Sequence, residues 1–197
     1  MSNDPYLHSA DQKLVLQVKS DLDRQEGFRE FAYPDPLSKL NKSQPSKRWG
    51  FEPAKNIAKP GTNLADGNPW TVGYGDTLGV TPETRTDKIK AERRLEQHIL
   101  ESDNRLRRAL PWYADATFVT KTILINMEYN MGLTGLLGFR NTLQFIKDKN
   151  YTQAAKNMEA SLWYRQVKGR AVELVERMKT QTIPDKYKAP ESIRWMM

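Results

Sequence analysis

The chain has 197 residues, no cysteine and two histidines, and its 31 Lys and Arg outnumber 24 Asp and Glu for a net charge of +7. This length suffices to bury a core. The missing cysteines exclude a disulfide framework and a Cys-ligated metal, and His8 and His98 alone do not suggest another metal site, so we expect no metal and no cofactor. The positive charge favours polyanionic partners, namely nucleic acid, anionic membrane surfaces or acidic bacterial envelope polymers.

Two further features concern location. The chain contains no run of about 18 apolar residues, the length that crosses a membrane as a helix. The first residues, "MSNDPYLHSADQ", have neither the basic nor the apolar region of a signal peptide. We therefore expect a soluble protein that is made in the cytoplasm and has no stable membrane anchor.

The first predicted element is an amphipathic helix that begins near residue 12. Apolar residues recur at helical spacing from Leu14 to Leu22, with Asp11 as the expected N-cap and Gly27 as the residue that ends the helix. Glu26 would then be the last helical residue. The negative end of the helix dipole disfavours a carboxylate at that position, so this acid calls for an explanation.

Residues 28–80 are rich in Pro and Gly and predict short strands and loops. Within them, Pro36–Ala65 carries six basic residues against one acid. A loop of this length is either a solvated insertion or a functional segment. The functional alternative here is a basic clamp in which Trp49 and Phe51 help to hold an anionic substrate. The stretch "WTVGYGD", Trp70–Asp76, predicts a strand that two glycines interrupt.

The remainder of the chain predicts helices. A long helix over 86–110, capped by Thr86 or Asp87, suits a connector between two lobes. Its apolar face is expected to contain Ile89, Leu95, Ile99, Leu106 and Leu110. Further helices are predicted at about 115–131, 140–148, 152–163 and 167–179, with Trp163 in the core.

These elements predict an α+β fold that is predominantly helical. We expect a single domain over 1–197 with a small β-containing lobe and a larger helical lobe joined by the long helix. Its parts are the first helix and small lobe at about 12–85 with a basic insertion near 36–65, the connecting helix at about 86–110, the helical lobe at about 111–180, and a surface tail at 181–197.

The stretch "EGFREFAYPD" places two acids, Glu26 and Asp35, among aromatic residues. Glycoside hydrolysis requires one carboxyl group that keeps its proton and one that is ionised. Glu26, close to Phe28 and Phe31, is expected to be the protonated group, and Asp35, on a proline-flanked loop, the ionised one. From the residues alone, a pair of ordinary surface acids with nearby arginine partners stays an open alternative.

The same residues resemble the phage lysozymes of the T-even type, glycoside hydrolase family twenty-four. Members of that family have Glu-Gly, then Tyr-x-Asp, then Thr-Ile/Val-Gly-x-Gly, which "EGFREFAYPD" and "WTVGYG" match. Residues Leu124–Ala171, beginning "LINMEYNMG", are similar to the large helical lobe of these enzymes almost without gaps. Together the matches cover most of residues 12–180 outside the insertion, and they imply a lysozyme-like fold.

The resemblance implies hydrolysis of the β-1,4 bond between N-acetylmuramic acid and N-acetylglucosamine with inversion, for which two carboxyl groups stand about 6.5–9.5 Å apart. It gives Glu26 the role of general acid, Asp35 that of the carboxylate that activates water, and Thr71 that of the hydroxyl that orients the water. The insertion places Thr71 36 residues after Asp35, so Asp66 is an alternative second carboxylate. Asp76 stands where the family usually has His.

The resemblance also implies six substrate-binding positions. Arg170 is expected to hold the catalytic acid in place, and Tyr129 can stack on a sugar ring. The six positions are Thr77 in the small lobe and Tyr129, Asn130, Thr142, Asn157 and Arg170 in the helical lobe.

The leading hypothesis is a monomeric phage muramidase, an endolysin or a virion-borne lysozyme, that acts on peptidoglycan glycan strands. It would pass from the host cytoplasm to the periplasm and cell wall through a holin pore. A lysozyme-fold protein that binds the wall without cleaving it, or is regulated, is the alternative. A nucleic-acid binder is a third hypothesis, against which stand the distributed charge and the missing nucleic-acid motif.

Overall fold

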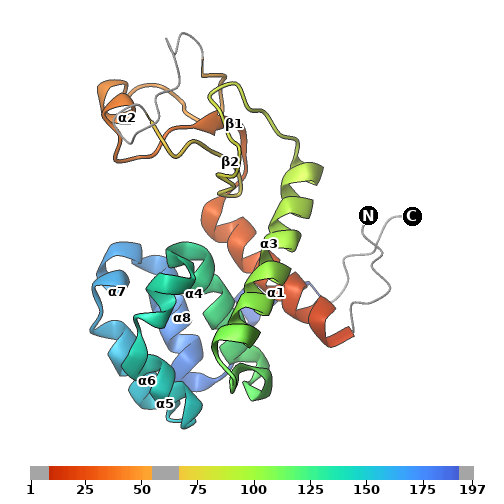
Figure 1. Cartoon of the computed structure of the whole chain (residues 1–197), viewed down its shortest axis with the longest axis vertical. Coiled ribbons are helices and arrows are strands. Elements are labelled where there is room, and N and C mark those ends of the chain that lie inside the picture. The colour runs from red at the N-terminus through yellow and green to blue at the C-terminus, as the bar shows by residue number, and fades with distance from the viewer. Residues whose placement is uncertain (1–8, 55–66, 191–197) are drawn as a thin grey trace. The chain divides into compact units, whose positions relative to one another are not determined.

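The computed structural model describes residues 9–54 and 67–190, and Figure 1 shows its helices and strands. Mostly helical, with one sheet of two strands, the described chain confirms the predicted α+β class. In chain order the elements are α1 (Ser9–Glu26), β1 (Arg29–Tyr33), α2 (Lys39–Ser43), β2 (Thr71–Gly73), α3 (Lys88–Ala109), the 3-10 turn η2 (Tyr113–Asp115), α4 (Phe118–Leu137), α5 (Arg140–Lys147), α6 (Tyr151–Glu159), α7 (Leu162–Val167), α8 (Gly169–Thr180) and the 3-10 turn η3 (Asp185–Tyr187).

The chain divides into two compact units. The small unit comprises Leu22–Gln97, and the helical unit comprises the residues up to Asp21 and from His98 onward. The boundaries fall within α1 and α3, so each of these helices contributes to both units. Among the helices in the described part of the chain, none combines the length and the apolar character that a membrane crossing requires.

The small unit is built around the antiparallel pair of β1 and β2, in which Tyr33 lies opposite Thr71. The predicted strand at "WTVGYGD" is thus confirmed over three residues. The described part of the insertion packs on this sheet, because the Phe31 N–H donates to the Gly50 carbonyl at 3.0 Å. The ring of Trp49 also meets the buried ring of Trp70 edge-on, with the centroids 5.9 Å apart.

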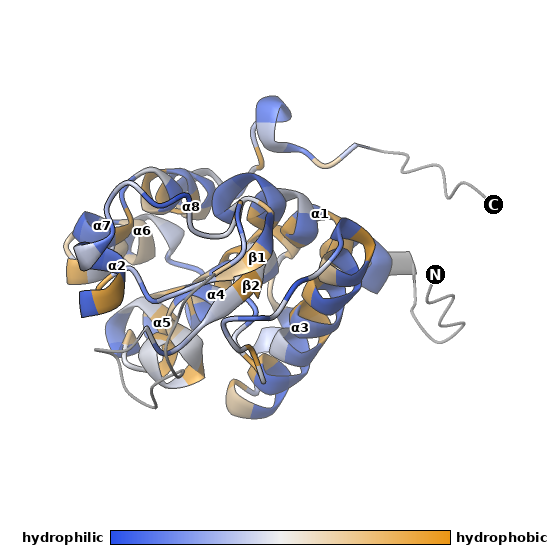
Figure 2. Ribbon diagram, turned by 90° about the horizontal axis from the view of Figure 1, so that it is seen from above, coloured by the Kyte–Doolittle hydropathy of each residue, from blue (hydrophilic) through white to orange (hydrophobic). Residues whose placement is uncertain are grey.

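The buried faces of the long helices α1 and α3 are largely those predicted, but two single-residue predictions are wrong. Asp11 lies inside the first turn of α1 and is not its N-cap, because the helix begins at Ser9. The side chain of Asp87 caps α3 as predicted, accepting the Lys90 N–H at 2.8 Å. Ile89 is 66% exposed and does not belong to the apolar face. Ile89 lies six residues before Leu95, and this spacing turns it away from the buried side of the helix. Figure 2 shows hydrophobic and hydrophilic residues alternating along α3.

The helical unit is formed by α4 and the shorter helices α5–α8, among which α8 contacts α4, α6 and α7. The middle of α4 is fully buried, and a non-helical Gly132 with φ of 73° kinks it. The single helix predicted at 152–163 is wrong, since the chain forms α6 and α7 instead. Ser161 separates the two by accepting the Tyr164 N–H at its hydroxyl, which starts α7.

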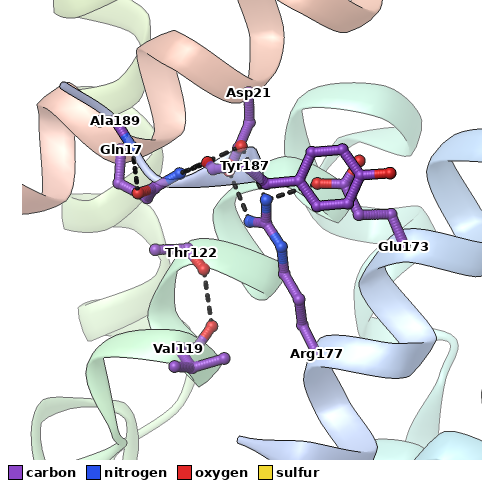
Figure 3. Close-up of polar contacts among 8 residues, drawn as sticks. All are labelled: Gln17, Asp21, Val119, Thr122, Glu173, Arg177, Tyr187 and Ala189. Carbon is purple, nitrogen blue, oxygen red and sulfur yellow. Dashed lines mark hydrogen bonds and ion pairs between the residues drawn. The ribbon is translucent and has the colours of Figure 1, made fainter. Parts of the chain in front are cut away.

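A buried charge cluster, defined by Asp21, Glu173 and Arg177, joins α1 to α8 inside the helical unit (Figure 3). The Arg177 guanidinium donates to the two Asp21 oxygens at 2.6 and 2.8 Å and also to Glu173. The side chain of Arg177 is 0% exposed, so all three charges are shielded from water. Burial of a charge requires such pairing.

The described part of the tail lies against α1. The Gln17 amide donates to the Tyr187 carbonyl at 2.8 Å, and its oxygen accepts the Ala189 N–H at 2.9 Å. The Tyr187 ring also covers the Arg177 guanidinium, with 5.7 Å between the guanidinium carbon and the ring centroid. The tail therefore packs more firmly than a loose surface segment, up to the end of the described residues.

Candidate active site

Glu26 is the last residue of α1, as predicted, and is partly buried. Gly27 ends the helix with φ of +68°, and its N–H donates to the Asp23 carbonyl at 3.1 Å. The chain then enters β1 at Arg29. Glu26 therefore lies at the junction of helix and sheet in the small unit, where the carboxylate meets the negative end of the helix dipole.

Asp35 lies at the base of the insertion, two residues after β1. Its backbone N–H donates to the Gly67 carbonyl at 2.9 Å, and its Oδ1 accepts the Leu37 N–H at 2.7 Å. The first bond closes the insertion and returns the chain to within four residues of Thr71. The alternative carboxylate, Asp66, lies outside the described residues, so the choice of Asp35 stays a prediction.

Thr71 begins β2 and faces Tyr33 across the sheet. Residues opposite each other in an antiparallel pair place their side chains on the same face of the sheet, so the side chains of Thr71 and Tyr33 are neighbours. Because Asp35 follows Tyr33 by two residues, strand pairing brings the predicted water-orienting hydroxyl close to the chain segment that carries the predicted carboxylate. The insertion separates these residues in sequence and leaves the sheet intact between them.

Tyr33 is the site residue that the sequence did not single out beyond its aromatic character. Burial raises its pKa, and the negative charge of Glu26 raises it further, whereas Arg29 and the Thr71 hydrogen bond act in the opposite direction. The phenol is therefore close enough to Glu26 for the charge of that residue to affect its pKa, and it faces Thr71 across the sheet. The cross-strand position opposite Thr71 was the signal that would have identified it.

Asp76 and Thr77 follow β2. Asp76, at the position where the resemblance expects His, forms an ion pair with Arg94 at 2.9 Å and accepts the Leu78 N–H at 3.1 Å. The extra negative charge of Asp76 is thus balanced within the small unit. Thr77 is exposed, and its contact with saccharide stays a prediction.

In the helical unit, three of the predicted saccharide residues take part in two side-chain hydrogen bonds. Thr142 is buried and donates its hydroxyl to Asn157 Oδ1 at 2.7 Å. Asn130 is exposed, and its Oδ1 accepts the Trp163 Nε1–H at 2.9 Å. These bonds fix the orientation of both asparagine side chains, which leaves their NH₂ groups as defined donors.

A pocket of about 620 Å³ is lined by one member of each bonded pair, Asn157 and Trp163. Phe139 also lines it, with Ser161 and Gln166 among its polar residues. Trp163 is 7% exposed, which confirms its predicted place in the core, yet its ring also forms part of the pocket wall. Aromatic walls with a few oriented polar groups suit a sugar.

The ring of Tyr129 makes one aromatic contact that the sequence did not predict. Its ring lies against His98 with the centroids 4.8 Å apart and the planes at 51°. The two residues are 31 positions apart, so no local spacing indicates the contact.

Arg170 is the second residue of α8 and is partly buried. Its role beside Glu26 stays a prediction from the resemblance. No group of three or more acidic or histidine side chains capable of holding a metal occurs in the described ranges.

Comparisons with known proteins match most of the chain. The sequence model of the family described as "Phage lysozyme" matches residues 55–181. The chain is 31% identical over 71 residues to "Probable T4-type lysozyme 1" of Dictyostelium discoideum, over 36% of this chain and 42% of that protein. It is 29% identical over 134 residues to "Peptidoglycan hydrolase gp36" of Pseudomonas phage phiKMV, over 66% of this chain and 15% of that protein. The matched segments span less than half the length of either relative.

The family match includes some site residues and leaves out others. Thr71, Thr77 and all the predicted saccharide residues of the helical unit lie inside it, whereas Glu26 and Asp35 precede residue 55, where it begins. The two carboxylates therefore depend on the motif and on the local geometry described above.

Proposed function

The chain belongs to the phage lysozyme family, and from this premise we propose that it hydrolyses peptidoglycan at the β-1,4 bond between N-acetylmuramic acid and N-acetylglucosamine, with inversion. The observation that supports the proposal is the position of Tyr33, which faces Thr71 across the sheet and whose pKa is raised by the negative charge of Glu26. The proposed acid and the proposed water-orienting hydroxyl would then lie on either side of one partly buried phenol.

The proposed reaction uses the small-unit residues in three roles. Glu26 donates its proton to the glycosidic oxygen as the bond from that oxygen to the anomeric carbon breaks. A water molecule attacks the anomeric carbon from the opposite face, and Asp35 accepts the proton that the water loses. Thr71 holds this water through its hydroxyl. The net result is one hydrolysed bond and an inverted anomeric centre.

Saccharide binding is assigned to the pocket of the helical unit. Asn157 and Asn130 offer donors whose directions are set by Thr142 and Trp163, and the Trp163 ring offers an apolar wall. Sugars present hydroxyl and amide groups around apolar ring faces, so such a mixture of surfaces fits them. Tyr129 would add a second aromatic surface.

The decisive test of the catalytic roles is Glu26→Gln, which keeps the shape of the side chain and removes the acid. Release of reducing ends from purified peptidoglycan sacculi should fall by about 10²–10⁴, with an unchanged circular dichroism spectrum. Glu83→Gln is the matched control, because Glu83 is an exposed acid of the same unit. A Glu26→Gln variant that hydrolyses sacculi at the wild-type rate would refute the assignment.

A second measurement separates cleavage from binding. The wild-type protein should release products whose anomeric configuration, followed by NMR, is inverted; retention would contradict the water-activating role of Asp35. If the wild-type protein sediments with sacculi and releases no reducing ends, the chain is a wall-binding protein that does not cleave.

The proposed biological setting is phage-mediated lysis of the host. Glycan strands of peptidoglycan are then the partner, and a holin pore would admit the protein to the wall. Permeabilising Gram-negative cells with chloroform replaces the pore in an assay. Turbidity should then fall with the wild-type protein and stay constant with Glu26→Gln.

A further inference from the structure

The insertion carries a surface that the proposed catalytic roles do not use. We call it the basic aromatic surface, and it consists of Arg29, Lys47, Arg48, Trp49 and Phe51. The Phe51 ring is 51% exposed, and two guanidinium carbons, of Arg29 and Arg48, lie 4.4 and 5.4 Å from its centroid. The Lys47 ammonium lies 4.2 Å from the centroid of Trp49. Three cations are thus positioned on two neighbouring rings.

The surface has a defined geometry because it is attached to the sheet. Gly50, between the two rings, accepts the Phe31 N–H of β1. The Arg29 side chain passes so close to Gly50 that an added Cβ would lie 2.7 Å from its Cδ. Trp49 packs on the buried Trp70. These contacts give the surface a defined geometry on the sheet.

The two arginines of this surface form no ion pair within the described residues. Neither Arg29 nor Arg48 forms an ion pair with any carboxylate in ranges 9–54 and 67–190, whereas Arg85 and Arg94 of the same unit pair with Glu30 and Asp76. Like charges held together repel one another and raise the local concentration of anions. Guanidinium groups also match carboxylates with paired hydrogen bonds.

Arg29 connects this surface to the proposed catalytic acid. Its Nη1 donates to the Phe28 carbonyl at 3.1 Å and lies within 3.2 Å of the position that a Cβ on Gly27 would take. An anion bound at the surface is therefore close to the turn that follows Glu26. The anion that fits best is a group on the same polymer that the acid would cleave. In peptidoglycan the groups that carry carboxylates are the peptide stems.

We propose that the basic aromatic surface binds carboxylates of the peptide stems of peptidoglycan. This inference rests on the proposed function and narrows its substrate class to glycan strands that bear peptides. Arg48 and Arg29 bind the carboxylate, and Phe51 contacts the apolar part of the peptide. The described part of the insertion then acts as a substrate-selecting surface of the small unit.

The test compares intact sacculi with sacculi from which an amidase has removed the stems and on which the lactyl carboxylates that this cleavage exposes have been converted to amides. Arg48→Glu and Phe51→Ala are the variants, and Arg93→Glu, an exposed arginine on α3 of the same unit, is the matched charge control. On intact sacculi, Arg48→Glu should raise KM about tenfold, and the same change in a Glu26→Gln background should weaken co-sedimentation about tenfold. Phe51→Ala should act in the same direction, and Arg93→Glu should change either quantity less than about twofold.

On stem-free glycan the variants should match the wild-type protein, and about 0.5 M salt should remove the difference on intact sacculi. Equal losses for Arg48→Glu and Arg93→Glu, or equal losses on both substrates, would overturn the proposal. Weakened binding to lipopolysaccharide micelles with unchanged binding to sacculi would assign the surface to phosphate and also overturn it. If the wild-type protein cleaves neither substrate, the proposed function fails, and co-sedimentation still tests the surface.

Discussion

Replacing Arg177 with Met should destabilise the protein by about 3–5 kcal/mol, because it leaves two buried carboxylates without their cation. Methionine preserves most of the aliphatic volume and removes the charge. Asp21 is 1% exposed and Glu173 is 7% exposed, so water cannot easily replace the guanidinium. The loss should therefore exceed that of an exposed salt bridge, which is about 0–1 kcal/mol.

The magnitude follows from the contacts. Arg177 makes three charge-assisted hydrogen bonds in the cluster, two to Asp21 and one to Glu173. At about 1.5–3 kcal/mol each, they would sum to about 4.5–9 kcal/mol. The variant also avoids the free-energy cost of burying the guanidinium. This saving offsets part of the lost bonding free energy and leaves a net loss of about 3–5 kcal/mol. For a protein of this size the melting temperature should fall by about 6–20 °C.

Urea unfolding followed by circular dichroism measures the loss. Lys179→Met, an exposed position on the same helix, is the control and should lie within about 0.5 kcal/mol of the wild-type protein. Replacing all three members of the cluster by Leu and Met should recover most of the stability, since whole-cluster apolar replacement is often neutral or better. If Arg177→Met unfolds within about 1 kcal/mol of the wild-type protein, the cluster does not stabilise the helical unit as argued.

Three further predictions test the site. Gly27→Ala should lower the free energy of unfolding by about 1–2 kcal/mol, measured in urea, because φ of +68° disfavours a Cβ. Tyr33→Phe should lower kcat on sacculi about tenfold with KM unchanged, because it removes the hydroxyl that faces Thr71 across the sheet; an unchanged kcat would show that Thr71 needs no such partner. Trp163→Phe should raise KM about tenfold with kcat unchanged, because Asn130 loses its donor beside the pocket; a wild-type KM would exclude the pocket from saccharide binding.

The end of α1 and the start of α3 were predictable because each depends on a few neighbouring residues. Gly27 ends α1 and Asp87 caps α3, as the sequence predicted. The position of Glu26 on the last turn follows directly from Gly27. The fold class was equally accessible, because helical periodicity covers most of the chain and β-branched and aromatic residues gather in one short stretch.

Contacts between distant segments were not predictable from one sequence. Asp21 and Arg177 are 156 positions apart, and neither has a local pattern that marks it as buried. His98 against Tyr129 is a second such contact. Ile89 failed for a different reason: an apolar residue in a helix is exposed when its spacing departs from the buried stripe, and hydrophobicity alone does not reveal this. Tertiary packing decides the first two cases, and helical spacing decides the third.

The pairing of β1 with β2 explains how the insertion can exist without separating Thr71 from the segment that carries the proposed carboxylate. The hydrogen bond from Asp35 to Gly67 closes the loop at its base, and the Tyr33–Thr71 pair lies just beyond that base. Closing a longer loop adds little entropy cost, since each doubling of length costs only about 0.6 kcal/mol. The register of the two strands is set by their own pairing and not by the loop between them. The insertion can therefore add a basic surface to the small unit while Tyr33 keeps its contact with Thr71.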